Sequence, residues 1–460
     1  MSFLITEGLS CDQVLQRDSE DRASISVKGT CSVQGSHKVL VTVFSREVPL
    51  EGFNAVPLGA AESEAWSARI IGIPTGGPYL VRLEVEGEST EVRGVYVGDL
   101  WVLAGQSNME GCGDLIDVEL PAPYVHVLDM ADRWHIAEEP LHWLIDSPDS
   151  SHCETSGEEQ RLQQIEARKT RTKGAGLGLS FAKAMYAETG VPIGLLACAH
   201  GGTSMQQWSP ELKQLGGGSL YGSMLGRVKR AGGKVAGVLW YQGESDANST
   251  DAPLYLNRMK ALITSIRADF KSPELPFYYV QIGRVIFPKE WGADSPQDWN
   301  AIQEHQRRLP NLIPNTGMVT SVDLELDDLI HIGTQGLKRL GERLASIALN
   351  ENEGVQLNSV SVEGSNRDRV RVSFIGVPEE GFEENLRVLG FSVRREDGEE
   401  VPAIYKAHTD DENPEDILLE LVAPLEKGLF LWYGWGFDPA CTLTDYEDGA
   451  VPVFGPVALS

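Results

Sequence analysis

Two segments of the chain contain residues that could carry out acyl transfer, one with a serine and the other with a histidine. Ser107 follows the apolar run DLWVLAG (99–105), and small or turn-prone residues flank it. A hydroxyl just beyond a parallel strand lies at the sheet edge where ligands bind, and it can serve as a nucleophile. Serines in strand-to-helix turns more often cap the helix, so this residue alone does not establish a function.

The second place is the segment DLELDDLIHIGTQG (323–336), which precedes the last predicted helix and holds Asp328 and His331 in an Asp-x-x-His arrangement. A nucleophilic serine needs a base, and the base needs a carboxylate that orients it and stabilises the imidazolium. Asp323 and Asp327 compete for the carboxylate role, and the spacing favours Asp328. A lone loop histidine is more often simply solvated.

Paired glycines, Gly201 and Gly202, follow a further apolar run. They could bring backbone N–H groups close to a ligand, and such donors can form part of an oxyanion hole. The same pair could equally be a tight turn without function. His200 adjoins the glycines and is a rival base, although no nearby carboxylate is spaced to orient it.

A fourth segment, VLWYQGESDAN (238–248), places Gln242, Glu244 and Asp246 after another apolar run. The Gln242 amide could donate to an oxyanion, whereas Glu244 and Asp246 could act as acids or cap a turn. Each of the four signals is modest alone. All of them lie at the ends of successive predicted strands, so they should converge in space. Together they supply the nucleophile, base, carboxylate and oxyanion donors that acyl transfer requires.

The elements that must position these residues alternate between strands and helices. Near-continuous apolar runs predict five parallel strands covered on both faces, at 99–105, 192–201, 236–243, 276–283 and 317–325. Apolar residues recur at helical spacing in 179–190, 220–233, 252–270, 300–309 and 333–351. The pattern predicts an α/β domain with a five-stranded parallel doubly wound sheet over residues 95–351.

Two β-rich regions flank this domain. Residues 1–94 contain short alternating runs rich in Val and Ile, which predict an N-terminal β-sandwich-like domain. The β pattern returns over residues 352–460, where we expect a C-terminal β domain. The polar segment 145–173 interrupts the α/β pattern, and a solvated loop is favoured there over a mobile lid.

The composition narrows the range of partners. The chain of 460 residues has 39 Lys and Arg against 67 Asp and Glu, a net charge of −28. Such a surface repels phosphate backbones and anionic lipid heads, so we expect neither a nucleic-acid nor a membrane partner. No apolar run approaches the roughly 20 residues that cross a bilayer, and the N-terminus lacks the features of a secretory signal. We expect a cytoplasmic protein, or an exported one if a signal has been removed.

The six cysteines are widely scattered, with no C-x-x-C pair and no Cys/His cluster at zinc spacing. Cys31 and Cys198 lie in apolar runs, where burial is expected. Free thiols are favoured over disulfides.

Taken in order, GQSNM, GGT-x4-W, WYQGES and DxxH resemble the motifs of the SGNH-hydrolase superfamily. More narrowly, they are similar to those of the sialate O-acetylesterase-like carbohydrate esterases. The flanking VLQR (14–17), GGPY (76–79), GDLW (98–101) and YGWGFDP (433–439) also look like that family's pattern. The resemblance therefore covers nearly the whole chain, with the least support over 352–430.

The resemblance implies a serine esterase that removes O-acetyl groups from carbohydrates through an acyl-enzyme, with no metal and no cofactor. It implies Ser107 as nucleophile, His331 as general base and acid, and Asp328 as the carboxylate that orients the imidazole. It implies oxyanion donors from the Ser107 backbone, from a glycine of the pair (Gly202) and from Gln242. Many members of the superfamily have an asparagine where this chain has Gln242.

The resemblance implies an acetylated carbohydrate as the substrate, and the identity of the sugar stays open. Trp208 is the best candidate for an aromatic side chain that lines the sugar site, and Arg284 could pair with the carboxylate of a sialate. Two other functions are possible. The flanking β domains would suit a non-catalytic glycan-binding protein. A glycosidase would use two carboxylates such as Glu244 and Asp328, roughly 5–9.5 Å apart, and would leave the serine and histidine without roles.

Overall fold

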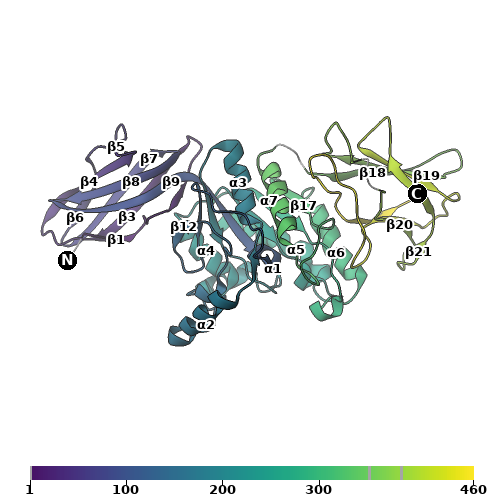
Figure 1. The fold of residues 1–460 in the computed structure, drawn as a ribbon, viewed down its shortest axis with the longest axis horizontal. Coiled ribbons are helices and arrows are strands. Elements are labelled where there is room, and N and C mark those ends of the chain that lie inside the picture. Colours follow the sequence, from purple (N-terminus) through teal and green to yellow (C-terminus); the bar gives the residue numbers. More distant parts are fainter. Residues whose placement is uncertain (1–2, 351–353, 384–386, 460) are drawn as a thin grey trace.

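The computed structural model describes residues 3–350, 354–383 and 387–459, and it has a central α/β part with a β-rich part at each end (Figure 1). Across these residues the buried apolar side chains form three cores, one for each part. The N-terminal core draws on residues 3–97. Apart from Val14, the buried residues of the central core come from 96–347. The C-terminal core draws on residues 322–459.

The N-terminal part is one sheet that folds around its own core, and its strand pairs are antiparallel apart from the parallel pairing of β2 with β9. Along β3 every second side chain is buried, as the period of two in a half-buried strand requires. The predicted sandwich-like domain is therefore built from one continuous sheet and not from two separate ones. Its strands follow the order β1 (Leu4–Glu7), β3 (Arg22–Thr30), β7 (Ala65–Pro74), β6 (Val56–Glu62), β4 (Ser36–Ser45), β8 (Gly76–Val85) and β9 (Glu88–Gly105), with β2 (Val14–Gln16) beside β9 and β5 (Val48–Pro49) beside β4.

Strand β9 joins the N-terminal part to the central part. Its first half pairs with β8, and its second half pairs with β14 (Ile193–Ala197) and β15 (Gly237–Tyr241). The domain boundary predicted between residues 94 and 95 therefore falls inside one continuous strand.

The central sheet contains six parallel strands within the described residues, whereas the sequence predicted five. The additional strand is β11, whose four residues VHVL include His126 and so do not read as a long apolar run. The order is β11 (Val125–Leu128), β14, β9, β15, β16 (Phe277–Gln281) and β17 (Thr316–Thr320), with β12 (Trp134–Ile136) antiparallel beside β11.

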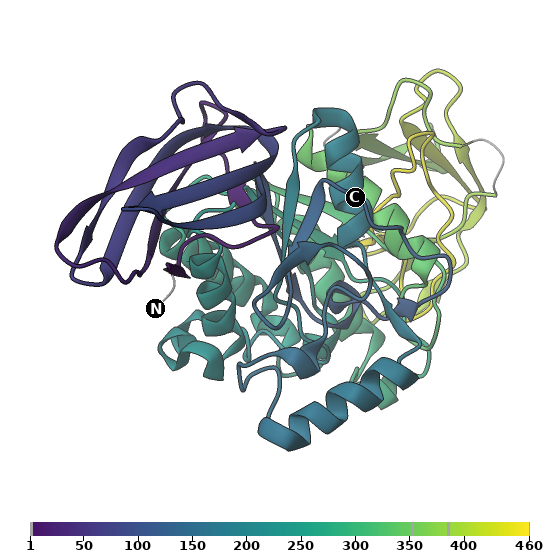
Figure 2. The same ribbon diagram turned by 60° about the vertical axis from the view of Figure 1, so that its left-hand side comes forward.

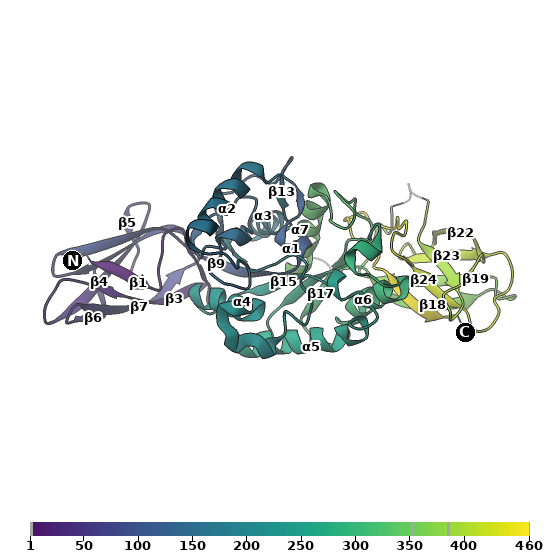
Figure 3. The same cartoon turned by 90° about the horizontal axis from the view of Figure 1, so that it is seen from below.

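Helices cover both faces of this sheet, as a doubly wound fold requires (Figure 3). On one face, α3 (Gly178–Thr189) packs against α7 (Thr334–Ala348). On the other face lie α4 (Leu220–Arg230) and α5 (Ala252–Asp269), and α6 (Pro296–Arg308) packs against α5. Short 3-10 turns are η2 (Pro210–Gly218), η3 (Glu244–Asp246) and η4 (Pro288–Trp291).

The segment 145–173 is not the solvated loop that the sequence favoured. It contains part of η1 (Leu144–Asp146) and all of α2 (Gly157–Thr170), which stands out from the central part at the bottom of Figure 2. Acidic residues in the first turn of α2 and basic residues in its last turn suit the helix dipole, which helps this exposed helix to form. After α2 the chain enters β13 (Lys173–Ala175), which pairs with β10 (Gly113–Asp114).

The C-terminal part consists of two four-stranded antiparallel sheets that enclose the third core. One sheet has the order β18 (Gln356–Glu363), β19 (Arg369–Ile375), β23 (Asp416–Leu421) and β22 (Ile404–Thr409). The other has the order β21 (Glu400–Val401), β20 (Phe391–Arg394), β24 (Phe430–Tyr433) and β25 (Phe454–Ala458).

Two further sequence predictions concern thiols and membranes. All six cysteines lie in the described ranges and are free, and Cys31 and Cys198 are buried as predicted. Among the described helices, none combines the length and the apolar character that a bilayer-spanning segment needs.

Candidate active site

Strand β9 ends in a tight turn that presents Ser107. Gly105 has a φ of 134°, and a Cβ at this position would lie 2.2 Å from the backbone oxygen of Tyr241, so only glycine fits. Ser107 is the first residue of α1 (Ser107–Glu110), and Gln106 occupies the capping position without a side-chain capping bond. Ser107 is therefore not the cap of this helix, which removes the structural role that most serines in such turns have.

Asp328 and His331 form the hydrogen-bonded pair that their spacing predicted. Nδ1 of His331 lies 2.8 Å from Oδ2 of Asp328 and 3.0 Å from Oδ1. Oδ1 also accepts hydrogen bonds from the backbone N–H groups of Ile330 and His331. Partial burial alone would raise the pKa of Asp328, but these hydrogen bonds lower it to about 2. The carboxylate is therefore ionised and fixed against the imidazole.

Asn108 ties the serine turn to the histidine loop. Its Oδ1 accepts a hydrogen bond of 3.0 Å from the backbone N–H of Ile332, and its Nδ2 donates to Oε1 of Glu244 at 3.0 Å. Because Asn108 follows Ser107 and Ile332 follows His331, the backbones of the two candidate catalytic residues lie side by side. The sequence motif contained Asn108, but its bridging role depends on a fold that joins residues more than 200 positions apart.

The rival residues for these roles have other partners. Asp327 accepts a hydrogen bond from the backbone N–H of Asp114, and Asp323 pairs with Arg343 at 2.7 Å. The other candidate base, His200, contacts the ring of His152 with 3.1 Å between their Nδ1 atoms. A second imidazole cannot supply the negative charge that stabilises an imidazolium.

The glycine pair lies directly beside Ser107. A Cβ added to Gly201 would come within 3.5 Å of Cβ of Ser107. The Gly201 N–H donates to Oε2 of Glu110 at 2.7 Å. Among the described residues, the N–H groups of Ser107 and Gly202 have no hydrogen-bond partner, and a Cβ on Gly202 would meet nothing within 4 Å. Two backbone donors without a partner among the described residues thus lie at this edge of the sheet, and open space adjoins Gly202.

Two predicted site residues point into the protein. Gln242 is fully buried. Its side-chain amide nitrogen, Nε2, donates to the Thr203 carbonyl at 3.0 Å and to Oδ2 of Asp246 at 2.6 Å. Both amide hydrogens are therefore engaged, which does not fit the predicted oxyanion role. Trp208 is also fully buried, and its ring packs edge-on against Trp240. A ring without exposure cannot stack on a sugar, so the predicted lining role of Trp208 is wrong for this conformation.

Burial shifts the ionisation of two glutamates next to the serine turn. It raises the pKa of Glu110 to about 7, although the Gly201 N–H and Arg171 favour the charged form. It also raises the pKa of Glu244, against the hydrogen bond from Asn108. Glu244 is 5% exposed, so it does not face a substrate and does not suit the glycosidase alternative.

The predicted insertion reaches the site at three points, which sequence reasoning missed. His152 contacts His200, Nη2 of Arg171 lies 3.8 Å from Oε1 of Glu110, and Nζ of Lys173 lies 3.6 Å from Oδ2 of Asp328. The high charge of this segment is evident in the sequence, but charge alone predicts solvation and not contact with a site.

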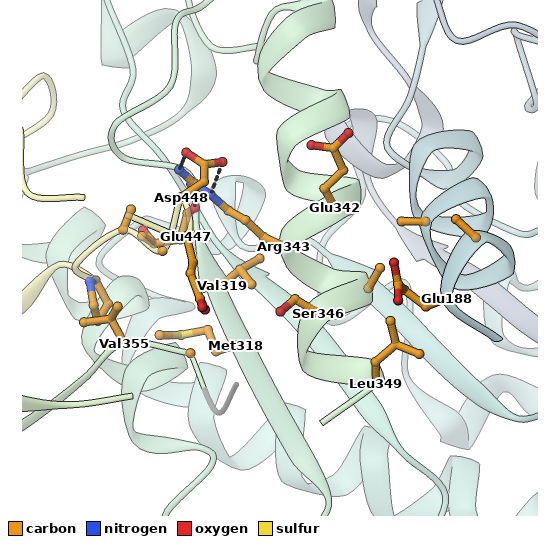
Figure 4. A pocket seen from close by; sticks show the side chains of 18 residues that line it. Glu188, Met318, Val319, Glu342, Arg343, Ser346, Leu349, Val355, Glu447 and Asp448 are labelled. Carbon is orange, nitrogen blue, oxygen red and sulfur yellow. Dashed lines mark hydrogen bonds and ion pairs between the residues drawn. The ribbon is translucent and has the colours of Figure 1, made fainter. Parts of the chain in front are cut away.

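A cavity of about 460 Å³ lies elsewhere, between α3, α7, β17 and the C-terminal part (Figure 4). None of the candidate catalytic residues lines it. Within the described residues, no three His, Cys, Asp or Glu side chains are arranged to hold a metal ion.

Residues 97–350 match the family described as carbohydrate esterase, sialic acid-specific acetylesterase, and they make up more than half of the chain. The chain belongs to this family. Its members are carbohydrate esterases, so the chain is a carboxylic ester hydrolase, and the resemblance to the sialate O-acetylesterase-like esterases is confirmed.

Individual relatives agree with this assignment. A probable carbohydrate esterase from Arabidopsis thaliana is 32% identical over 273 residues, which cover 54% of this chain and 90% of that protein. Human sialate O-acetylesterase is 26% identical over 370 residues, which cover 70% of this chain and 66% of that enzyme. The crystal structure of a carbohydrate acetylesterase from Xanthomonas citri has the same fold, with a TM-score of 0.68 and 23% identity over 98% of this chain and 99% of that one.

Proposed function

We propose that this esterase removes O-acetyl groups from a carbohydrate by way of an acyl-enzyme on Ser107. The observation that carries the proposal is the Asp328–His331 pair, held beside the serine turn by the hydrogen bond from Ile332 to Asn108. A nucleophile, a base and an orienting carboxylate are the three groups that this chemistry requires.

The contacts support one role for each group in the first step. With the ring hydrogen placed on Nδ1, which donates it to Asp328, the unprotonated Nε2 of His331 is the atom that accepts the proton of the Ser107 hydroxyl. The hydroxyl oxygen then bonds to the ester carbonyl carbon, and the C=O electron pair moves onto the carbonyl oxygen. When the tetrahedral intermediate collapses, the imidazolium protonates the departing sugar oxygen. Water attacks the acetyl-serine in the second half, with the same imidazole as base.

The oxyanion is assigned to backbone donors. The N–H groups of Ser107 and Gly202 have no hydrogen-bond partner among the described residues, and Gly201, which adjoins Gly202, lies beside the serine side chain. Each donor aimed at the developing charge contributes roughly 3–4 kcal/mol in other hydrolases. Gln242 holds the turn after β15 in place through Thr203 and Asp246 and does not join this set.

The structure offers no support for Arg284 as the partner of a sialate carboxylate. Its guanidinium pairs with Asp438 at 2.8 Å and with Glu325 at 3.2 Å, and it donates to the Leu324 carbonyl. A panel of acetylated substrates should therefore include neutral sugars as well as sialates.

The test compares the parent with Ser107→Ala, using acetate release from p-nitrophenyl acetate and from the sugar panel. We expect kcat/KM to fall by about 10³-fold or more, because no other hydroxyl takes the place of the nucleophile. Ser26→Ala, an exposed serine on β3, is the control and should retain full activity. A fluorophosphonate probe should label Ser107 in the parent only. A fully active Ser107→Ala enzyme would overturn the proposal.

A further inference from the structure

The ammonium group of Lys173 lies between two carboxylates at the candidate active site. Its Nζ is 3.5 Å from Oδ1 of Asp114 and 3.6 Å from Oδ2 of Asp328. The side chain as a whole is 39% exposed, but the nitrogen itself is buried and makes no hydrogen bond to the described residues. Its charge is therefore compensated by the two carboxylates and only weakly by solvent.

The local fold fixes this lysine against the histidine loop. Asp114 of β10 pairs with Lys173 of β13, and Nε of Arg171 donates to the Lys173 carbonyl at 2.7 Å. The Asp114 N–H donates in turn to Oδ2 of Asp327, next to Asp328. The short β10–β13 pairing is thus bonded to the loop whose carboxylate the lysine faces, and the insertion holds the ammonium at one place.

We propose that Lys173 is a positioning residue of the esterase site: its ammonium holds Oδ2 of Asp328 and limits the negative charge that Asp328 presents to His331. The inference rests on the proposed function, because it assigns Asp328 and His331 their roles. Asp328 shares Oδ2 between the two partners, with the imidazole at 2.8 Å and the ammonium at 3.6 Å. A cation there offsets part of the Asp328 charge and so opposes the positive charge that the imidazole gains during the reaction.

Other charged groups surround the pair. Those near it are Asp114 on β10, Asp327 on the same loop and Glu244 on η3, and also Cys112, around which Glu110 and Arg171 lie together with Asp328 and Lys173. Most of these groups are acidic or thiol, so they favour the imidazolium or leave it unaffected. Among the described residues, Lys173 and His331 are the basic side chains that lie within 4 Å of the Asp328 carboxylate. Removing Lys173 therefore changes the net charge around His331 more than the loss of a distant cation would.

The experiment measures the pH profile of kcat/KM for p-nitrophenyl acetate in the full-length protein. In Lys173→Met the imidazole becomes easier to protonate, so the acid limb should move to higher pH by roughly half a unit to one unit. At the plateau, kcat should fall about fivefold to tenfold with KM unchanged, because the Asp328 carboxylate loses one of its two side-chain partners. Lys173→Arg keeps the positive charge, so its acid limb should lie at the same pH as that of the parent.

Two further variants test the sign of the effect and its location. Asp114→Asn removes the competing carboxylate, so the ammonium acts on Asp328 alone and the acid limb should move to lower pH. Lys169→Met removes an exposed lysine of α2 from the same insertion and should leave the profile unchanged. A folded Lys173→Met enzyme with the acid limb and kcat of the parent would overturn the inference. A shift of the acid limb to higher pH in Asp114→Asn would overturn it as well.

The proposed function fails separately. If His331→Ala keeps parental activity, the assignment of the base is wrong. If His331→Ala is inactive while Lys173→Met behaves as the parent, only the role of Lys173 falls.

Discussion

Arg343 and Lys173 each lie between two carboxylates, and comparing them separates a structural ion cluster from one at the candidate active site. Arg343 of α7 lies between Asp323, which follows β17, and Asp448 of the C-terminal part. It donates to both carboxylates at 2.7–3.2 Å and to the Thr320 carbonyl at 3.0 Å. Burial alone would lower the pKa of Arg343, but the two carboxylates raise it above its usual value. This cluster fastens the central part to the C-terminal part.

Lys173 faces Asp114 and Asp328 at 3.5 and 3.6 Å, without a hydrogen bond to either. A guanidinium offers a planar fork of donors that locks carboxylates in place, whereas an ammonium acts mainly as a point charge. Two positive charges of the same size therefore have different expected effects, because one is hydrogen-bonded to its carboxylates and the other is not. The arginine cluster should govern stability, and the lysine cluster should govern the reactivity of the neighbouring imidazole.

The largest expected effect comes from changing one aspartate in each cluster to asparagine. Asp328→Asn should lower kcat by about 10³–10⁴-fold, because a neutral amide neither fixes the imidazole tautomer nor stabilises the imidazolium. Asp323→Asn should leave kcat unchanged. Acetate release and the urea midpoint are measured for both variants. If Asp323→Asn lost as much activity as Asp328→Asn, the proposed division between the clusters would be wrong.

The second comparison removes the cations themselves. Arg343→Met should lower the free energy of unfolding by about 3–5 kcal/mol, because it leaves Asp323 buried without its main partner. Lys173→Met should lower it by less than about 1 kcal/mol, since its carboxylates are partly exposed. Urea denaturation at pH 7 measures both values. Equal losses in the two variants would contradict the contrast between them.

The sequence predicted the regular parts of this architecture well, because strand and helix periodicity reflects local burial. Five of the six parallel strands were predicted, and β11 was missed because its four residues include a histidine. The same reasoning identified the segments that meet at the sheet edge, since parallel strands carry their functional groups at one end. It also selected Asp328 over its neighbours by spacing alone.

Side-chain direction could not be predicted in the same way. Gln242 and Trp208 belong to the segments that meet at the site, yet both are fully buried. Asn108 and Lys173 gain their roles from contacts with residues far along the chain. A motif identifies a segment, but tertiary packing decides which of its side chains face the substrate and which support the turn.

A third prediction concerns Glu110, a buried carboxylate close to the lysine cluster. Its pKa of about 7 in the folded protein lies above the 4.5 of an exposed glutamate, so the folded chain binds an extra proton between these pH values. Stability from this group is therefore present below pH 4.5 and is lost as the pH rises through about 7. Glu110→Gln cannot ionise and should be more stable than the parent at pH 8 by up to about 3 kcal/mol.

The comparison uses urea denaturation at pH 4 and at pH 8. The advantage of Glu110→Gln should vanish at pH 4, where the parental carboxyl is protonated in both states. Glu342→Gln, at an exposed position of α7, is the matched control and should follow the parent at both values. Parental stability of Glu110→Gln at pH 8 would show that the carboxylate is not destabilised by its burial.

The smallest expected effect tests a neutral contact beneath the same site. Nε1 of Trp208 donates to Oγ1 of Thr203 at 3.0 Å, and the Thr203 carbonyl accepts from Gln242. Trp208→Phe removes one neutral hydrogen bond and should lower the free energy of unfolding by about 1 kcal/mol. KM for an acetylated sugar should stay unchanged, because the ring is buried and contacts no substrate. A tenfold rise in KM at unchanged stability would instead mean that Trp208 reaches the sugar. The Trp208–Thr203 contact would then affect substrate binding, which neither charged cluster is expected to do.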